Sequence, residues 1–237
     1  RACSWSVHSA AHTRLRHNSA PSVLTSLTRV STHRAVCPQC LRPRSACICA
    51  LAPSVPTDTQ VLILQHPQEV HEAKGTARLL HLSLPASQLV VAETFDETEL
   101  QRWLHQPWDA SDAPRQAVLL YPQTPGEPVA SFSPEDPQAR ATPLRLVVID
   151  GTWRKSRKML YANPLLAQLP RLALTDTGPA AYTIRKAQRE GQLSTMEAAT
   201  HALQALEGWP AQAWQLQALQ QSFAGLIAQH QQLRAPR

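Results

Sequence analysis

Two short stretches of the sequence carry residues that can do chemistry. The first is Asp150-Gly151-Thr152-Trp153, which follows the apolar run 146–149. Four basic residues follow it: Arg154, Lys155, Arg157 and Lys158. Because cations oppose the dipole at the start of a helix, a helix that begins with them is expected to present that end to an anion. The simpler interpretation is a solvated basic helix that Asp150 only caps.

The second stretch holds four cysteines within thirteen residues, with the spacing C-x2-C-x6-C-x-C. They are Cys37, Cys40, Cys47 and Cys49. Four thiolates this close favour a tetrahedral zinc site, and four protein ligands leave no open position, so the predicted role is structural. An iron–sulfur cluster or unmetallated thiols are the alternatives. Disulfides require an oxidising compartment, for which the sequence carries no signal.

The apolar run 146–149 predicts a buried strand, with Gly151 permitting a sharp turn and Thr152 capping the next helix. Further strands are predicted at 60–65, 87–92, 117–121 and 171–174, and helices at 74–82, 97–105, from 193 onward and at 211–233. This order predicts an α/β fold with a mostly parallel sheet and flanking helices. Ligands of such sheets bind beyond the carboxyl ends of the strands, so the polar turns there are expected to form the site.

Two of these polar stretches also have plain structural interpretations. His66 and Glu69 follow the strand 60–65 and either hold a ligand or cap the next helix. Ser194 and Glu197 have the S/T-x-x-E spacing of a capping box, which alone explains their presence.

The basic charge of the chain is concentrated near its beginning. Of a net +6, residues 1–57 contribute seven Arg and no acid, which makes this part a candidate nucleic-acid contact. Residues 1–34 are predicted to be a disordered basic tail, 35–52 a four-cysteine zinc-binding knuckle, and 57–233 the main α/β domain. No apolar stretch approaches the length of about 20 residues that spans a membrane, and no secretory signal is present, so we expect a cytoplasmic protein.

Five motifs follow one another along the chain in this order: the cysteine knuckle, HPQE with KGTARLL, LLYP, DGTWRKSRKML and STMEA. Together they closely resemble the DTW-domain family, the tRNA-uridine aminocarboxypropyltransferases, over about residues 35–207. The resemblance implies a fold related to the SPOUT superfamily, with a knotted C-terminal half that holds S-adenosylmethionine in a bent pose.

The resemblance also implies a reaction. The 3-amino-3-carboxypropyl group of S-adenosylmethionine passes to ring nitrogen 3 of a uridine in tRNA, which forms acp3U and releases methylthioadenosine. Two other functions are considered: a methyltransferase that uses the same donor on RNA, and a non-catalytic zinc-ribbon RNA-binding factor. The sequence does not indicate which tRNA or uridine is modified, or the oligomeric state.

Under this resemblance, Asp150 removes the imide proton of uracil or orients the ammonium group of the donor. Thr152 donates a hydrogen bond, and Trp153 stacks on uracil or adenine unless it packs the helix against the sheet. The expected donor-binding residues are Tyr121, Pro122, Leu172, Leu174, Ser194, Thr195 and Glu197. The expected tRNA-binding residues are His66, Glu69, Lys74, Arg154, Lys155, Arg157, Lys158 and Arg185.

Overall fold

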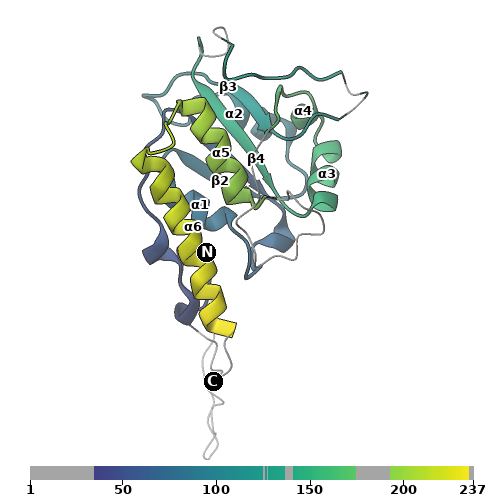
Figure 1. The fold of residues 1–237 in the computed structure, drawn as a ribbon. Coiled ribbons are helices and arrows are strands. Elements are labelled where there is room, and N and C mark those ends of the chain that lie inside the picture. The colour runs from purple at the N-terminus through teal and green to yellow at the C-terminus, as the bar shows by residue number, and fades with distance from the viewer. Residues whose placement is uncertain (1–34, 125, 127, 137–140, 175–192, 235–237) are drawn as a thin grey trace, which may run out of the picture. The chain divides into compact units, whose positions relative to one another are not determined.

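The fold is a five-stranded, all-parallel sheet with helices on both faces, which confirms the expected α/β class (Figure 1). The computed structural model describes residues 35–124, 126, 128–136, 141–174 and 193–234, which belong to one compact unit. The strands lie in the order β2-β1-β4-β3-β5. Their bounds are β1 Gln60–Gln65, β2 Ser87–Val91, β3 Gln116–Leu120, β4 Leu144–Asp150 and β5 Arg171–Leu172.

Side chains of successive strand residues point to opposite faces, so each strand feeds two hydrophobic clusters. On one face, Val61 and Ile63 of β1 pack in the same cluster as residues of α1, α5 and α6. On the other, Leu62 and Leu64 pack in the same cluster as residues of α2, α3 and α4. The helices are α1 Ala77–Ser83, α2 Glu97–His105, α3 Trp153–Ala162, α4 Pro164–Ala167, α5 Thr195–Glu207 and α6 Trp214–Arg234. The central strands are covered on both faces, as their unbroken apolar sequences require.

The segment that contains the four cysteines packs against α6. It contains the 3-10 helices η1 (Arg44–Ala46) and η2 (Cys49–Leu51). The Gln229 side-chain amide donates to the carbonyl of Cys47 at 2.9 Å. A Cβ on Gly225 would lie 3.0 Å from a methyl carbon of Leu51, so the glycine lets α6 approach η2 closely.

Two predicted helix starts are confirmed, and two others are corrected. Thr152 caps α3, and Ser194 with Glu197 forms the complete capping box of α5. The helix expected from residue 74 begins only at Ala77, because the 3-10 helix η3 (Pro67–Glu69) and tight turns that end at Gly75 come first. The last helix likewise starts at Trp214 rather than near 211.

Some expectations lie outside the described residues. The tail 1–34, Arg185 and the segment 175–192 are among them, and the predicted knot is not addressed by the described part of the chain. Among the described helices, none is both long and apolar enough to cross a bilayer.

Candidate active site

Asp150 ends β4 at the carboxyl edge of the sheet and is held by two side chains that come from different elements. The Gln65 side-chain amide donates to Asp150 Oδ2 at 2.9 Å, and the Thr195 hydroxyl donates to Asp150 Oδ1 at 2.5 Å. Asp150 is only 5% exposed. Hydrogen bonds donated to a carboxylate stabilise its ionised form, so these two donors favour the carboxylate of Asp150.

Thr195 is the first residue of α5, and the capping box explains why it is placed so firmly. Ser194 Oγ accepts from the backbone N–H of Glu197 at 3.2 Å, and Glu197 Oε2 accepts from that of Ser194 at 2.8 Å. The backbone N–H of Met196 donates to Thr76 Oγ1 at 3.1 Å, just before α1. Of the predicted donor-binding residues on this helix, Thr195 therefore contacts Asp150, whereas Ser194 and Glu197 build the helix start.

Trp153 lies on the first turn of α3 and is 49% exposed, so it is not the core residue that the alternative interpretation required. Its ring meets that of Tyr121 edge-on, with centroids 5.4 Å apart and an interplanar angle of 83°. Tyr121 is buried, and burial raises the pKa of its phenol. The pair presents one exposed indole beside a buried phenol.

Asp150 and Tyr121 share the same edge of the sheet but point to opposite faces. Tyr121 packs in the cluster of α2, α3 and α4, together with Ala117 and Leu119 of β3. Asp150 continues the alternation of Leu146 and Val148, whose side chains pack in the cluster of α1, α5 and α6. The acid and the aromatic pair thus flank the sheet edge from its two sides.

The basic residues of α3 are partly neutralised by acids from neighbouring strand ends. Lys155 Nζ lies 2.8 Å from Glu69 Oε1, and Lys158 Nζ lies 2.7 Å from Glu93 Oε1. These pairs hold the start of α3 against the segments that follow β1 and β2. The two arginines differ from the lysines. Arg154 is exposed and makes no ion pair with the described residues. The guanidinium carbon of Arg157 lies 5.9 Å from the ring centroid of Tyr161.

His66 and Glu69 both contact neighbouring segments of the chain. His66 Nδ1 accepts from the backbone N–H of Gln68 at 3.2 Å and thereby caps η3, so its Nε2 donates to Glu93 at 2.8 Å. Hydrogen bonds from Lys158 and His66 lower the pKa of Glu93. Glu93 and Gln65 were not predicted from the sequence, although both stand at strand ends, the signal that identified Asp150.

The remaining predicted residues are placed as follows. Leu172 is buried in the hydrophobic core, and Leu174 packs against it. Pro122 is exposed, and its carbonyl accepts from Arg171 at 3.3 Å. Lys74 lies near His230 of α6: burial and the charges of Arg234, Lys74 and Arg42 lower the pKa of His230.

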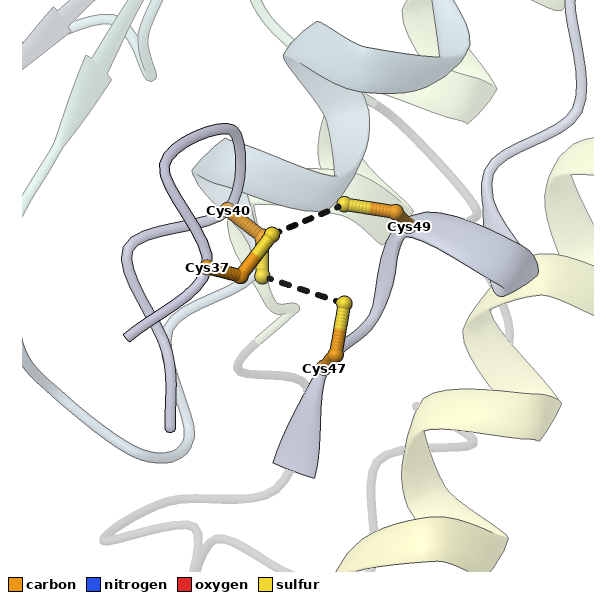
Figure 2. A group of neighbouring side chains, drawn as sticks. All are labelled: Cys37, Cys40, Cys47 and Cys49. Atoms are coloured by element: carbon orange, nitrogen blue, oxygen red, sulfur yellow. Dashed lines mark hydrogen bonds between the residues drawn. The ribbon is translucent and has the colours of Figure 1, made fainter. Parts of the chain in front are cut away.

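The four cysteines point their sulfur atoms at one another, and they can hold a metal ion (Figure 2). Cys37 and Cys49 have sulfurs 3.7 Å apart, as do Cys40 and Cys47, and all four sulfurs lie within 4.8 Å. A tetrahedron with metal–sulfur bonds of about 2.3 Å has edges of about 3.8 Å, so the spacing fits four-coordinate zinc.

The turn that follows the first two cysteines brings the chain back on itself. Leu41 has a left-handed backbone with φ of 59°, which lets the Cys37 N–H donate to the carbonyl of Arg42 at 2.8 Å. Backbone N–H groups of Cys40 and Gln39 lower the pKa of Cys37 to about 6, whereas burial and the neighbouring sulfurs raise that of Cys49 to about 12. All four sulfurs could be thiolates together only if a bound cation balanced their charge.

Comparison with known proteins gives consistent matches. The chain is 35% identical over 182 residues to the tRNA-uridine aminocarboxypropyltransferase 2 of Drosophila melanogaster, covering 73% of this chain and 67% of that protein. It is 28% identical to the protein of the same name from Macaca fascicularis and 27% identical to the tRNA-uridine aminocarboxypropyltransferase A of Arabidopsis thaliana. These matches cover 73% of this chain each, and 57% and 73% of the two relatives.

No solved structure matches the chain. The DTW domain family matches residues 34–231, which is most of the sequence. The chain therefore belongs to the DTW domain family.

Proposed function

We propose that this protein transfers the 3-amino-3-carboxypropyl group of S-adenosylmethionine to ring nitrogen 3 of a uridine in tRNA. The bond between the sulfonium sulfur and the propyl carbon breaks, a carbon–nitrogen bond forms, the imide proton leaves, and methylthioadenosine is released. The relatives named above support the reaction. The observation that carries it is the buried Asp150 at the carboxyl edge, fixed by Gln65 and Thr195, with the exposed indole of Trp153 three residues later.

Asp150 is better suited to orient the donor than to remove a proton. Its two oxygens already accept from Gln65 and Thr195, and such bonds stabilise the carboxylate and make it a weaker base. An ionised carboxylate at this edge attracts the ammonium group at the amino-acid end of the donor. Positioning then decides the reaction, because the uridine must meet the propyl carbon rather than the methyl group of the sulfonium.

The exposed side of Trp153 gives an unpaired base a surface on which to stack, with Thr152 as an adjacent hydrogen-bonding group. Arg154 and Arg157 are exposed on the same helix and are proposed to bind phosphates. Lys155 and Lys158 contribute positive charge while their ion pairs hold α3 in place. Binding of tRNA is therefore expected to weaken as salt is raised.

Tyr121, Pro122 and the backbone at Leu172 and Leu174 are proposed to hold the adenosyl part of the donor. We further propose that the four cysteines bind structural zinc, since a site with four protein ligands leaves no position for a reacting water. In this view residues 35–52 form the zinc-binding segment and residues 57–233 the catalytic domain.

The reaction is tested by incubating the purified protein with unmodified tRNA and S-adenosylmethionine. Mass spectrometry of the nucleosides should show a uridine heavier by the aminocarboxypropyl group, and chromatography should show methylthioadenosine. A methylated base with S-adenosylhomocysteine would instead identify a methyltransferase. Tight tRNA binding without any binding of S-adenosylmethionine would identify a non-catalytic RNA-binding protein.

A further inference from the structure

Gln65 carries a buried hydrogen-bond acceptor that the fold leaves unused. It is the last residue of β1 and is 2% exposed. Its Nε2 donates to Asp150 Oδ2 at 2.9 Å, but its Oε1 has no hydrogen-bond partner within the described part of the chain. Buried polar atoms are nearly always paired, so an orphan acceptor beside a candidate active site calls for an external donor.

The direction of this acceptor is set by its neighbour. An ionised carboxylate only accepts, so the amide of Gln65 must turn its NH2 group toward Asp150 and its oxygen away. Gln65 and Asp150 are also paired across β1 and β4, which places both side chains on the face that α5 covers. The edge thus places an amide oxygen, which carries a partial negative charge, beside the carboxylate of Asp150.

This pair of acceptors selects the kind of group that can bind. A carboxylate or phosphate is repelled, and the best match is a cationic group with several N–H bonds. S-adenosylmethionine has two cationic centres, but its sulfonium has no N–H, whereas its α-ammonium has three. The ammonium is therefore the part of the donor that satisfies an orphan amide oxygen.

We propose that Gln65 Oε1 accepts a hydrogen bond from the α-ammonium of S-adenosylmethionine, next to the carboxylate of Asp150. This inference rests on the proposed function and adds a donor-binding residue to it. By holding the far end of the amino-acid chain, Gln65 helps to present the propyl carbon to the nucleophile. The rigid end of β1 supplies the acceptor already oriented.

The test compares ligands with and without the ammonium. Calorimetry should show that Gln65→Met weakens S-adenosylmethionine binding by roughly 10- to 100-fold, as loss of a hydrogen bond to a charged group predicts. Methylthioadenosine, which lacks the amino-acid end, should bind within about twofold of wild type. Gln88→Met is the matched control, since Gln88 lies on β2 opposite Leu62, three residues before Gln65 on β1, and should change neither affinity.

If Gln65→Met weakened the binding of both ligands equally, Gln65 would have a structural role and the inference would be wrong. The inference would also be wrong if the variant bound both ligands as tightly as the wild type. A second measurement uses wild-type protein alone and does not depend on the variant folding. Deaminated S-adenosylhomocysteine should bind roughly 10-fold or more weakly than S-adenosylhomocysteine, and equal binding would contradict the proposal. If the wild type binds none of these ligands, the proposed function itself fails, which is a distinct result.

Discussion

Thr195 donates from its hydroxyl to Asp150 Oδ1 across 2.5 Å and thereby joins the start of α5 to the end of β4. The two residues are 45 positions apart in sequence. Gln65 approaches the other carboxylate oxygen from the neighbouring strand, so the acid is held from two directions. The two hydrogen bonds fix the position of the Asp150 carboxylate and offset the free-energy cost of burying it.

Replacing Asp150 with Asn keeps the size of the side chain and removes its charge. We expect turnover to fall by roughly 100-fold or more, the scale seen when a single preorganised electrostatic group is lost. Affinity for tRNA, measured by filter binding, should stay within about twofold because α3 and its cations are untouched. Loss of both turnover and tRNA affinity would mean that Asp150 is structural.

Thr195→Val removes only the hydroxyl that donates to Asp150. A hydrogen bond of this kind contributes about 1 kcal/mol net, so its loss predicts a fall of roughly fivefold in kcat/KM for S-adenosylmethionine. Thr195→Ser restores the hydroxyl and should recover most of the wild-type value. If Ser and Val behave alike in steady-state assays, the hydroxyl has no part in placing Asp150.

The two lysine pairs of α3 should differ in their effect on stability. Lys155→Met leaves Glu69, which is 5% exposed, without its cation, and should cost about 1–3 kcal/mol in the free energy of unfolding. Lys158→Met should cost less than Lys155→Met, because the Lys158–Glu93 pair is more exposed and Glu93 keeps His66. Urea denaturation of the two variants measures the difference, and equal losses would contradict this ranking.

Removing the metal should destabilise the helical face that the cysteine stretch touches. Elemental analysis should find about one zinc per chain, and chelation or Cys40→Ser should remove it and lower the thermal midpoint by several degrees. Cys3→Ser, outside the cluster, is the control and should change neither quantity. A midpoint that is insensitive to chelation would rule out a structural zinc site.

Asp112, which contacts Gln60 near the amino end of the sheet, should make stability depend on pH. Burial opposes its ionisation, but hydrogen bonds from Arg115 and Gln60 prevail and lower its pKa from 3.8 to about 2. Its stabilising contribution is complete above about pH 4 and is lost as the pH falls toward 2. The stability difference between wild type and Asp112→Asn, followed by urea unfolding, should therefore shrink over that range; a constant difference would contradict the assignment.

Features that depend on neighbours within a few residues could be predicted from the sequence alone. The cap at Thr152, the capping box from Ser194 to Glu197 and the buried strand before Asp150 all follow from short-range chemistry, and each is confirmed. The clustering of the four cysteines was likewise predictable, because thirteen residues of chain leave their sulfurs little room to separate. The order of the motifs was enough to indicate the family.

Contacts between distant segments could not be predicted this way, because the order of the strands decides them. Gln65 meets Asp150 across 85 residues, and Glu69 meets Lys155 across 86, only because β1 lies beside β4. The same order and the alternation of side chains send Asp150 to one face of the sheet and Tyr121 to the other. A local sequence pattern identifies the polar residues at the strand ends. Which of them are in contact is determined by the order of the strands in the packed sheet, because residues far apart in the sequence become neighbours only there.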